Sequence, residues 1–162
     1  MKIRLDENIP NRVALAVIQV TANRAGYEVS FVRHGGPDPQ WIGEFAAQGG
    51  TAIVSGDYNI LQHWPNLIAY TESGLISFFP PKAYHHLNAF GKIAFLVRWW
   101  PAIVEKIKIS ARGDRWRLPM NWNEVDHTKM QAIKDPRVDD PEPVESTEHP
   151  TKQQSLPLPK PK

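Results

Sequence analysis

The chain has 162 residues, a formal net charge of +2 and 41% hydrophobic residues, which fits one globular domain with additional material. It has no cysteine, so disulfide bonds and thiolate metal sites are excluded, and a reducing cytoplasm is the expected location. No charged segment followed by an apolar run opens the sequence, and no stretch approaches the roughly 18 apolar residues that a membrane-spanning helix needs. We therefore expect a cytoplasmic protein that has no membrane partner.

The beginning of the chain alternates strands with helices. Residues 2–5 predict a short strand. The apolar spacing of residues 13–20 predicts a helix after it, with Asn8 or Asn11 as the N-cap. Residues 27–32 predict a second strand. This order is typical of a parallel sheet with right-handed crossovers.

A second helix and a third strand follow. Asp38 is predicted as the N-cap and Pro39 as the first helical residue, and the helix ends at the glycines of residues 49–50. Residues 51–55 are almost continuously apolar, which is typical of a strand that is buried on both faces of a parallel sheet.

The remainder of the domain is less regular. We predict a fourth strand over residues 75–79, a helix over residues 84–99 that Pro101 kinks or restarts, and a final strand over residues 115–118. The apolar side chains of this helix that share one face are Leu87, Phe90, Ala94 and Val97. The whole pattern predicts a three-layer α/β/α domain with a mostly parallel, Rossmann-like central sheet.

The chain divides into a domain over residues 1–120 and an extended tail over residues 121–162. Seven of the 15 prolines, and no Phe, Trp or Tyr, lie in residues 136–162. The isolated apolar residues of such a segment cannot bury enough surface to offset its ordering entropy. We therefore expect a disordered, polar and proline-rich tail, with ordering on a partner as the alternative.

Three aspartates follow predicted strands, namely Asp6, Asp38 and Asp57. In open parallel sheets, sites form beyond the carboxyl ends of the strands, so these side chains are expected to converge. Converging carboxylates repel one another unless a cation neutralises them or one takes up a proton. Oxygen ligands without His or Cys favour Mg²⁺ or Mn²⁺. The alternatives are structural, because Asp38 suits an N-cap and Asp57 suits a turn.

Three motifs carry a family resemblance: Leu5–Pro10, Asp38–Ile42 and Val54–Asn59. In this order and at this spacing they resemble the PIN-like superfamily, and in particular its compact members, which open with an Asp-Glu-Asn-hydrophobic-Pro signature. The resemblance implies a nuclease-type acidic pocket that binds Mg²⁺ or Mn²⁺ and cleaves RNA. It also implies a toxin of a toxin–antitoxin pair, with RNA, an antitoxin protein and a second copy of the chain as partners.

The resemblance also implies roles for individual residues. Asp6, Asp38 and Asp57 match the acids that bind the metal and carry catalysis. Ser55 and Asn59 match the outer members of the family's Thr/Ser-x-Asp-x-Asp/Asn pattern and would support the third acid.

One departure separates this chain from larger PIN domains. Those domains supply a further acid from a helix between the first strand and the Asp38-like position, and that helical segment is absent here. Glu7 and Glu44 are acids that would substitute by residue type, but neither stands at the matching position. Glu7 is retained as a supporting group beside Asp6. The departure leaves an alternative, which is a catalytically inactive PIN-like module that binds RNA or protein.

Basic and aromatic residues gather between residues 92 and 117. Seven Lys and Arg residues stand there against two acids, with Trp99, Trp100 and Trp116 among them. This combination suits single-stranded nucleic acid, because cations follow the phosphates and aromatic rings stack on bases. The alternative is structural, because cations complement helix ends and tryptophans pack in cores. The residues predicted to contact RNA are Arg33, Lys92, Arg98 and Arg115.

A third functional class also places acids at strand ends. Phosphotransfer domains of receiver type do so, and they need a lysine late in the sheet. Lys82, which follows the predicted fourth strand, is the residue that fits this alternative.

Overall fold

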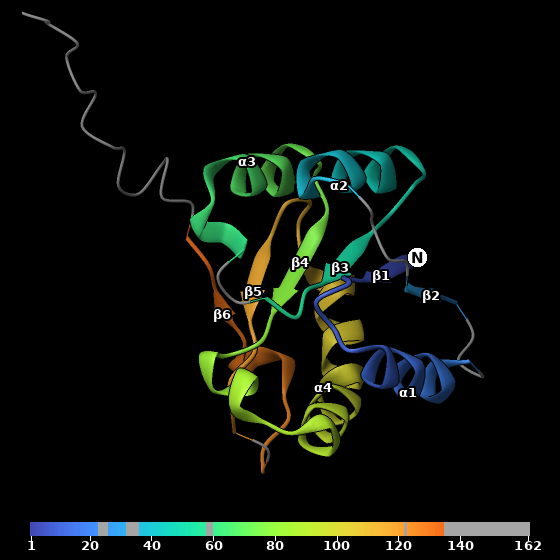
Figure 1. Cartoon of the computed structure of the whole chain (residues 1–162), viewed down its shortest axis with the longest axis vertical. Helices are drawn as coiled ribbons and strands as arrows, with labels where there is room; N and C mark the ends of the chain where they lie inside the picture. Colours follow the sequence, from blue (N-terminus) through green and yellow to red (C-terminus); the bar gives the residue numbers. More distant parts are fainter. Residues whose placement is uncertain (23–25, 32–35, 58–59, 122, 135–162) are drawn as a thin grey trace, which may run out of the picture.

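The computed structural model describes residues 1–22, 26–31, 36–57, 60–121 and 123–134. At its centre is a six-stranded sheet with the order β2-β1-β3-β4-β5-β6, in which β6 is antiparallel to β5 and the other neighbours are parallel (Figure 1). The strands are β1 (Lys2–Leu5), β2 (Glu28–Phe31), β3 (Ala52–Val54), β4 (Ile76–Phe79), β5 (Arg115–Arg117) and β6 (Gln131–Ala132). The mostly parallel α/β fold expected from the sequence is confirmed.

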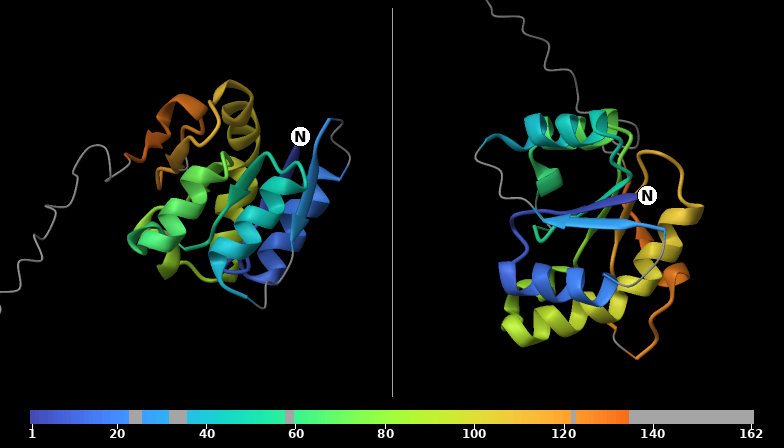
Figure 2. Two further views of the ribbon diagram at one scale, coloured as in Figure 1. Left: turned by 90° about the horizontal axis from the view of Figure 1, so that it is seen from above. Right: turned by 90° about the vertical axis from the view of Figure 1, so that its right-hand side faces the viewer.

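Helices cover both faces of the sheet. The α-helices are α1 (Asn11–Thr21), α2 (Asp38–Ala47), α3 (Trp64–Glu72) and α4 (Ala89–Ile109). The 3₁₀ helices are η1 (Ile60–Gln62), η2 (Lys82–His86) and η3 (His127–Lys129). Helices α1 and α4 contact each other on one face, and α2 and α3 contact each other on the opposite face (Figure 2). In the described part of the chain, no helix has the length and apolarity that crossing a membrane requires.

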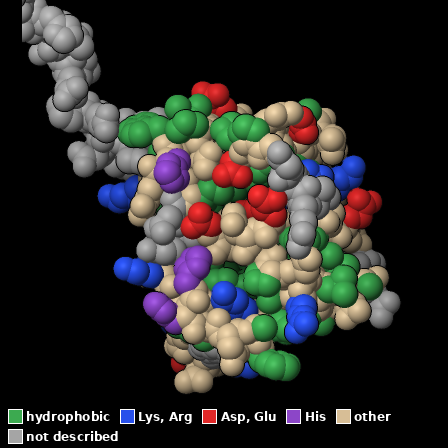
Figure 3. Space-filling model, viewed as in Figure 1, with side chains coloured by type: hydrophobic (Ala, Val, Ile, Leu, Met, Phe, Trp, Pro, Cys, Tyr) green, Lys and Arg blue, Asp and Glu red, His purple; other side chains and the backbone are tan. Residues whose placement is uncertain are grey.

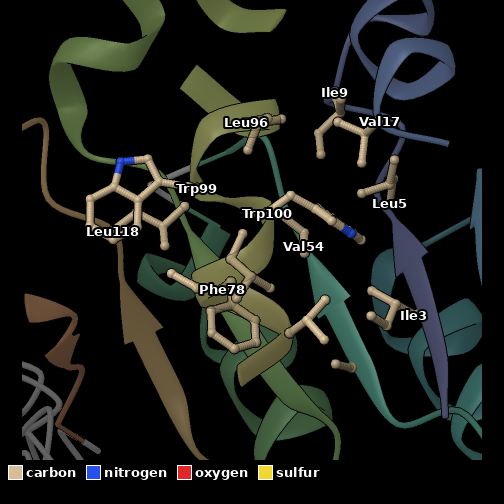
Figure 4. Packing of buried hydrophobic residues seen from close by; sticks show 14 of the residues in the cluster. Ile3, Leu5, Ile9, Val17, Val54, Phe78, Leu96, Trp99, Trp100 and Leu118 are labelled. Atoms are coloured by element: carbon tan, nitrogen blue, oxygen red, sulfur yellow. The ribbon is translucent and has the colours of Figure 1, made fainter. Parts of the chain in front are cut away.

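The larger core lies between the sheet and the α1/α4 layer. Trp99 and Trp100 of α4 are 1% and 2% exposed there, and they pack among strand residues such as Val54 and Phe78 (Figure 4). Side chains alternate between the faces of a strand, so Ile53 belongs instead to the smaller core beneath α2 and α3.

Helix α3 was not predicted. It begins at Trp64 with a proline in its first turn, where a missing N–H costs nothing because no intrahelical partner exists. Only Leu67 and Tyr70 among its residues are buried, so its apolar pattern is too short to stand out. This omission matters because α3 supplies two side chains of the candidate site.

The predicted N-caps are wrong. Pro10 and Pro37 occupy the cap positions of α1 and α2, and neither helix has a side-chain cap hydrogen bond. Asp38 is the first residue of α2 rather than its N-cap. The side chains of Asn8 and Asp38 instead make hydrogen bonds within the candidate site.

Helix α4 also differs from its prediction. It starts after Asn88, whose side chain accepts a hydrogen bond from the Gly91 N–H at 2.9 Å, and it continues through Pro101 to Ile109. The proline removes one backbone hydrogen bond, and the buried residues on either side of it hold the helix against the sheet. The predicted apolar face is only partly directed at the core: Leu87 and Val97 pack against the larger core, whereas Phe90 is 83% exposed.

The sheet extends beyond the predicted domain boundary at residue 120. Strand β6 pairs with β5, and Met130, just before it, is 5% exposed and packs in the larger core. An antiparallel strand at this position covers the edge that β5 would otherwise expose. The rest of the predicted tail, residues 135–162, lies outside the described residues.

Candidate acidic site

The site lies where the strand order of the sheet reverses. From β1 the chain crosses to β2 on one side and returns to β3 on the other. The carboxyl ends of β1 and β3 are therefore neighbours, and the N–H of Asp6 donates to the Val54 carbonyl at 3.0 Å. Such a switch point is where open α/β sheets bind their ligands. Asp6 follows β1 directly, and Ser55 follows β3 directly.

Asp6 is a buried carboxylate with several donors. It is 0% exposed, and the Ser55 hydroxyl donates to its Oδ2 at 2.6 Å. The backbone and side-chain N–H groups of Asn8 donate to Oδ1 and Oδ2, both at 3.3 Å. Burial raises the pKa of Asp6 and the nearby Asp38 adds to this, while the hydrogen bonds from Ser55 and Asn8 oppose it. A buried acid with a perturbed pKa at a strand end is a functional-site candidate.

Asp57 is connected to Asp6 through Ser55. The N–H of Asp57 donates to Ser55 Oγ at 3.1 Å, and Ser55 in turn donates to Asp6. Ser55 is 1% exposed, so this hydroxyl links the two loops that follow β1 and β3 from inside the protein.

Asp38 reaches the site from the start of α2. Its Oδ1 accepts from Trp41 Nε1 at 3.0 Å, one helical turn later. Its Oδ2 accepts from Asn66 Nδ2 at 2.9 Å. Asn66 lies in the first turn of α3, so this hydrogen bond joins the beginnings of α2 and α3 above the sheet.

The charges of all three aspartates act on Tyr70 of α3. It is 0% exposed, and its pKa is raised well above the ordinary value by burial and by the charges of Asp6, Asp38 and Asp57. The hydroxyl of Tyr70 is therefore within electrostatic range of all three acids. Neither Tyr70 nor Asn66 was predicted as a site residue. The spacing of Leu67 and Tyr70 on one helical face is the signal that was available.

The chemistry of these acids fits a hard divalent cation. Their ligand atoms are oxygens only. Burial is the main cause of the raised pKa of Asp6, and the charge of Asp38, which adds to it, is one that a cation would relieve. Across the described ranges of the chain, no three His, Asp or Glu side chains are arranged to hold one ion together. Mg²⁺ does not require three, because it usually keeps several waters and takes one or two carboxylates together with substrate phosphates.

Cationic side chains lie beside the acids. Figure 3 shows a group of Asp and Glu side chains below α2 and α3, with His, Lys and Arg side chains to either side of this group and further down towards α4. Lys92 is in the first turn of α4, and its Nζ lies 5.5 Å from the centre of the Tyr84 ring. Arg98 and Glu7 are both exposed. Arg33 and Asn59 lie outside the described residues.

The predicted contact of Arg115 with RNA is wrong, and the structural alternative holds for Trp99 and Trp100. Arg115 is 8% exposed, and its Nη1 donates to Thr71 Oγ1 at 2.6 Å, so it is not available to a phosphate at the surface. Trp99 and Trp100 are core residues and do not form a stacking platform. Trp116 is half-buried with Lys106 Nζ 3.6 Å from its ring centre. Basic and aromatic residues alternate here because α4 and β5 each have a core side and a solvent side.

Comparison with known families supports the resemblance that the motifs carry. Residues 1–82, slightly more than half of the 162 residues, match the model of a family described as a PIN-like domain. The match spans β1 to β4 and so contains all of Asp6, Asp38, Asp57 and Tyr70. It favours this family over the receiver-type alternative. Searches of curated proteins and of solved structures give no match.

Proposed function

The chain belongs to the PIN-like domain family, and we propose that it is a metal-dependent ribonuclease that hydrolyses RNA phosphodiester bonds. The fold is of nuclease type, and the observation that carries the proposal is the environment of Asp6. This carboxylate is fully buried at the end of β1 and has a raised pKa, with Asp38 and Asp57 close by. Open α/β sheets bind their ligands at such a switch point, and the three acids give this one a negative charge that suits a metal ion.

In this proposal the site of Asp6, Asp38 and Asp57 takes Mg²⁺ or Mn²⁺, with one or two of these carboxylates as ligands and water or RNA phosphate completing the coordination. The bound ion supplies charge stabilisation at the phosphoryl group and eases deprotonation of the attacking water. The chain's own residues orient the carboxylates: Ser55 acts on Asp6 and Asn66 acts on Asp38. Fixed carboxylates need no rearrangement when substrate arrives, which is the condition for efficient electrostatic catalysis.

The proposed RNA contacts are cations close to the acids. Helix α4 follows β4 and η2, so its first turn is on the same side of the sheet as the ends of β1 and β3. Lys92 in this turn suits the RNA backbone, and Arg98 is exposed two turns further along. Arg33, in the segment just before α2, is kept in the proposal from its sequence position. Contacts of this kind give affinity without reading sequence.

The cellular role that we propose is that of a toxin in a toxin–antitoxin pair in the cytoplasm. It rests on the likeness of Leu5–Pro10 to the compact PIN-like signature. Induced expression in bacteria should stop growth with the natural sequence and should not with Asp6→Asn. Equal growth of the two strains at equal protein levels would remove the toxin role while leaving ribonuclease activity to be judged in vitro.

A second candidate function is an inactive PIN-like module that binds RNA or protein. It is favoured by one observation: both oxygens of Asp38 already accept hydrogen bonds from protein groups. If these bonds persist, Asp38 has less capacity for a cation. RNA binding without cleavage, together with no heat of Mn²⁺ binding at millimolar concentration, would establish this candidate.

The decisive experiment incubates the purified protein with single-stranded RNA and Mn²⁺. We expect cleavage that EDTA abolishes and that Asp6→Asn lowers by about 100-fold or more, which corresponds to roughly 3 kcal/mol of transition-state stabilisation. Asp126→Asn is the matched control, because Asp126 is an exposed aspartate beside η3, away from the acidic site. Cleavage that survives Asp6→Asn unchanged would show that the acidic site does not carry the activity.

A further inference from the structure

The hydroxyl of Tyr70 is an enclosed donor inside the acidic site. Among the described residues, none makes a hydrogen bond of standard geometry with it. The ring is held edge-on against Phe79, with centroids 5.6 Å apart and an interplanar angle of 75°. A buried phenol normally finds an acceptor, because leaving its O–H unpaired costs free energy. The groups that the hydroxyl faces therefore determine its role.

A second tyrosine separates the effect of burial from the effect of the acids. Tyr84 is 1% exposed and its hydroxyl also makes no hydrogen bond to a described residue. Its pKa is raised by burial alone. The pKa of Tyr70 is raised by burial and by three carboxylates, while Ser55 acts in the opposite direction. Packing agrees with this difference, because Tyr70 lies one helical turn after Asn66, which donates to Asp38, and shares the smaller core with Ile53, two residues before Ser55. Tyr84 packs instead against Phe95 in the larger core.

Ser55 has the capacity to accept one more hydrogen bond. Its hydroxyl proton is given to Asp6 Oδ2 at 2.6 Å, and its Oγ accepts the N–H of Asp57 at 3.1 Å. A serine hydroxyl has one proton and two acceptor lone pairs. One lone pair thus remains, and the Tyr70 hydroxyl is a buried donor without a partner among the described residues.

We propose that Tyr70 is a positioning residue of the acidic site. Its O–H donates to Ser55 Oγ, whose own proton is held by Asp6, so that a chain from Tyr70 through Ser55 fixes the direction of the Asp6 carboxylate. Successive donors polarise one another and strengthen each bond. The effect on ligand binding rests on the proposed function, whereas the hydrogen-bonded chain itself does not.

A double-mutant cycle tests the chain without any metal or RNA. In EDTA, Tyr70→Phe should lower Tm by about 3–5 °C, as loss of one net hydrogen bond does in a domain of this size. In a Ser55→Ala background, Tyr70→Phe should lower Tm by less than half as much. Asp6→Asn is a second background if Ser55→Ala does not fold. Tyr84→Phe is the matched control and should not lower Tm.

Two outcomes of the cycle would overturn the proposal. One is an equal cost of Tyr70→Phe in all backgrounds, because a hydroxyl that acts through Ser55 and Asp6 cannot be independent of them. The other is an equal loss in Tyr84→Phe, because that result would make the cost a general property of buried tyrosines.

The positioning role has its own measurement, which is calorimetric titration with Mn²⁺ alone. Tyr70→Phe should weaken binding by about tenfold, the lower end of the effect of groups that orient metal ligands, and Tyr84→Phe should leave it unchanged. Equal affinities of Tyr70→Phe and the natural sequence would refute a positioning role. Failure of the natural sequence itself to bind Mn²⁺ counts against the proposed function, and the cycle still decides the hydrogen-bonded chain.

Discussion

Gly56 and Asn8 are in backbone contact, so that a Cβ atom on residue 56 would lie 2.6 Å from the carbonyl carbon of Asn8. This close approach joins the loop after β3 to the loop after β1, which are the two loops that present Asp57 and Asp6. Glycine is the one residue that allows it, because every other side chain would push backbone rather than a flexible side chain. The acidic site therefore depends on the lack of a Cβ atom at residue 56.

Gly56→Ala should separate the two loops. We expect the free energy of unfolding to fall by about 1–3 kcal/mol, as overpacking of a closed contact does, and Mn²⁺ binding to weaken with it. Urea denaturation measures the first effect. Gly43→Ala in α2 is the control, because nothing lies within 4 Å of its added Cβ; there alanine should stabilise the helix by about 0.5–1 kcal/mol. Unchanged stability of Gly56→Ala would show that the loops yield freely.

The raised pKa of Asp6 predicts a specific dependence of stability on pH. The folded protein holds a proton on Asp6 more tightly than the unfolded chain, whose ordinary value is 3.8. The contribution of Asp6 to the free energy of unfolding is thus complete below pH 3.8, and it is lost as the pH rises through the pKa of Asp6 in the folded protein. In EDTA, the natural sequence should lose stability relative to Asp6→Asn over this rise.

Asp126 gives the opposite sign and serves as the control for that experiment. Its pKa is lowered, first by the backbone hydrogen bond from Thr128. Its contribution is present above pH 3.8 and is lost as the pH falls through the folded pKa. The free energy of unfolding of the natural sequence should therefore increase relative to that of Asp126→Ala as the pH rises. Chemical denaturation of the three proteins across the acidic range measures how the free energy of unfolding of each depends on pH. If this dependence is the same for Asp6→Asn and the natural sequence, burial does not raise the pKa of Asp6.

Asn66 should act on the site through Asp38. Asn66→Ala removes the donor at 2.9 Å from Asp38 Oδ2, and loss of a hydrogen bond to a charged group should cost about 1–2 kcal/mol of stability. RNA cleavage should fall as well, through misplacement of Asp38. Gln40→Ala is the control, because Gln40 bonds Glu44 on the exposed side of α2 at 2.9 Å and such pairs contribute below about 0.5 kcal/mol. Equal cleavage by the two variants would separate Asn66 from the site.

The two ends of α4 should differ in their effect on RNA affinity. Lys92 lies in the first turn, at the end of α4 that follows β4 and η2, whereas Lys108, in the last turn, pairs with Glu105 at 2.7 Å. Lys92→Ala should weaken RNA binding and reduce the salt slope of log K by about 0.7, the value for one phosphate contact on a single strand. Lys108→Ala should change neither. Fluorescence anisotropy over a range of salt measures both, and equal slopes would remove Lys92 from the interface.

The sequence predicted those parts of the protein that depend on short-range patterns. Asp6 was identifiable because it interrupts an apolar strand, and Asp57 because it follows an apolar run that only a buried strand explains. The sequence left two interpretations open for Trp99 and Trp100, and the structure shows the core one, because their basic neighbours in sequence point to solvent while the indoles point to the sheet. That distinction depends on the helix orientation, which residue spacing near Pro101 did not determine.

The site residues that the sequence did not predict lie on α3, the helix that it also did not predict. Asn66 and Tyr70 reach the acids only because α3 packs against α2, and no local pattern near residue 64 predicts this long-range contact. The capping role expected for Asp38 failed for a related reason. Its oxygens bond to Trp41 and Asn66, and the second of these partners is distant in the chain.

The hydrogen bond between Trp41 and Asp38 has a practical consequence. Trp41 is 3% exposed, and its indole N–H donates directly to a carboxylate of the acidic site. Indole emission responds to charge and hydrogen bonding at the ring nitrogen. The protein therefore contains its own fluorescent reporter of Asp38, and the difference in emission between the natural sequence and Trp41→Phe follows occupation of the site in real time, without a label.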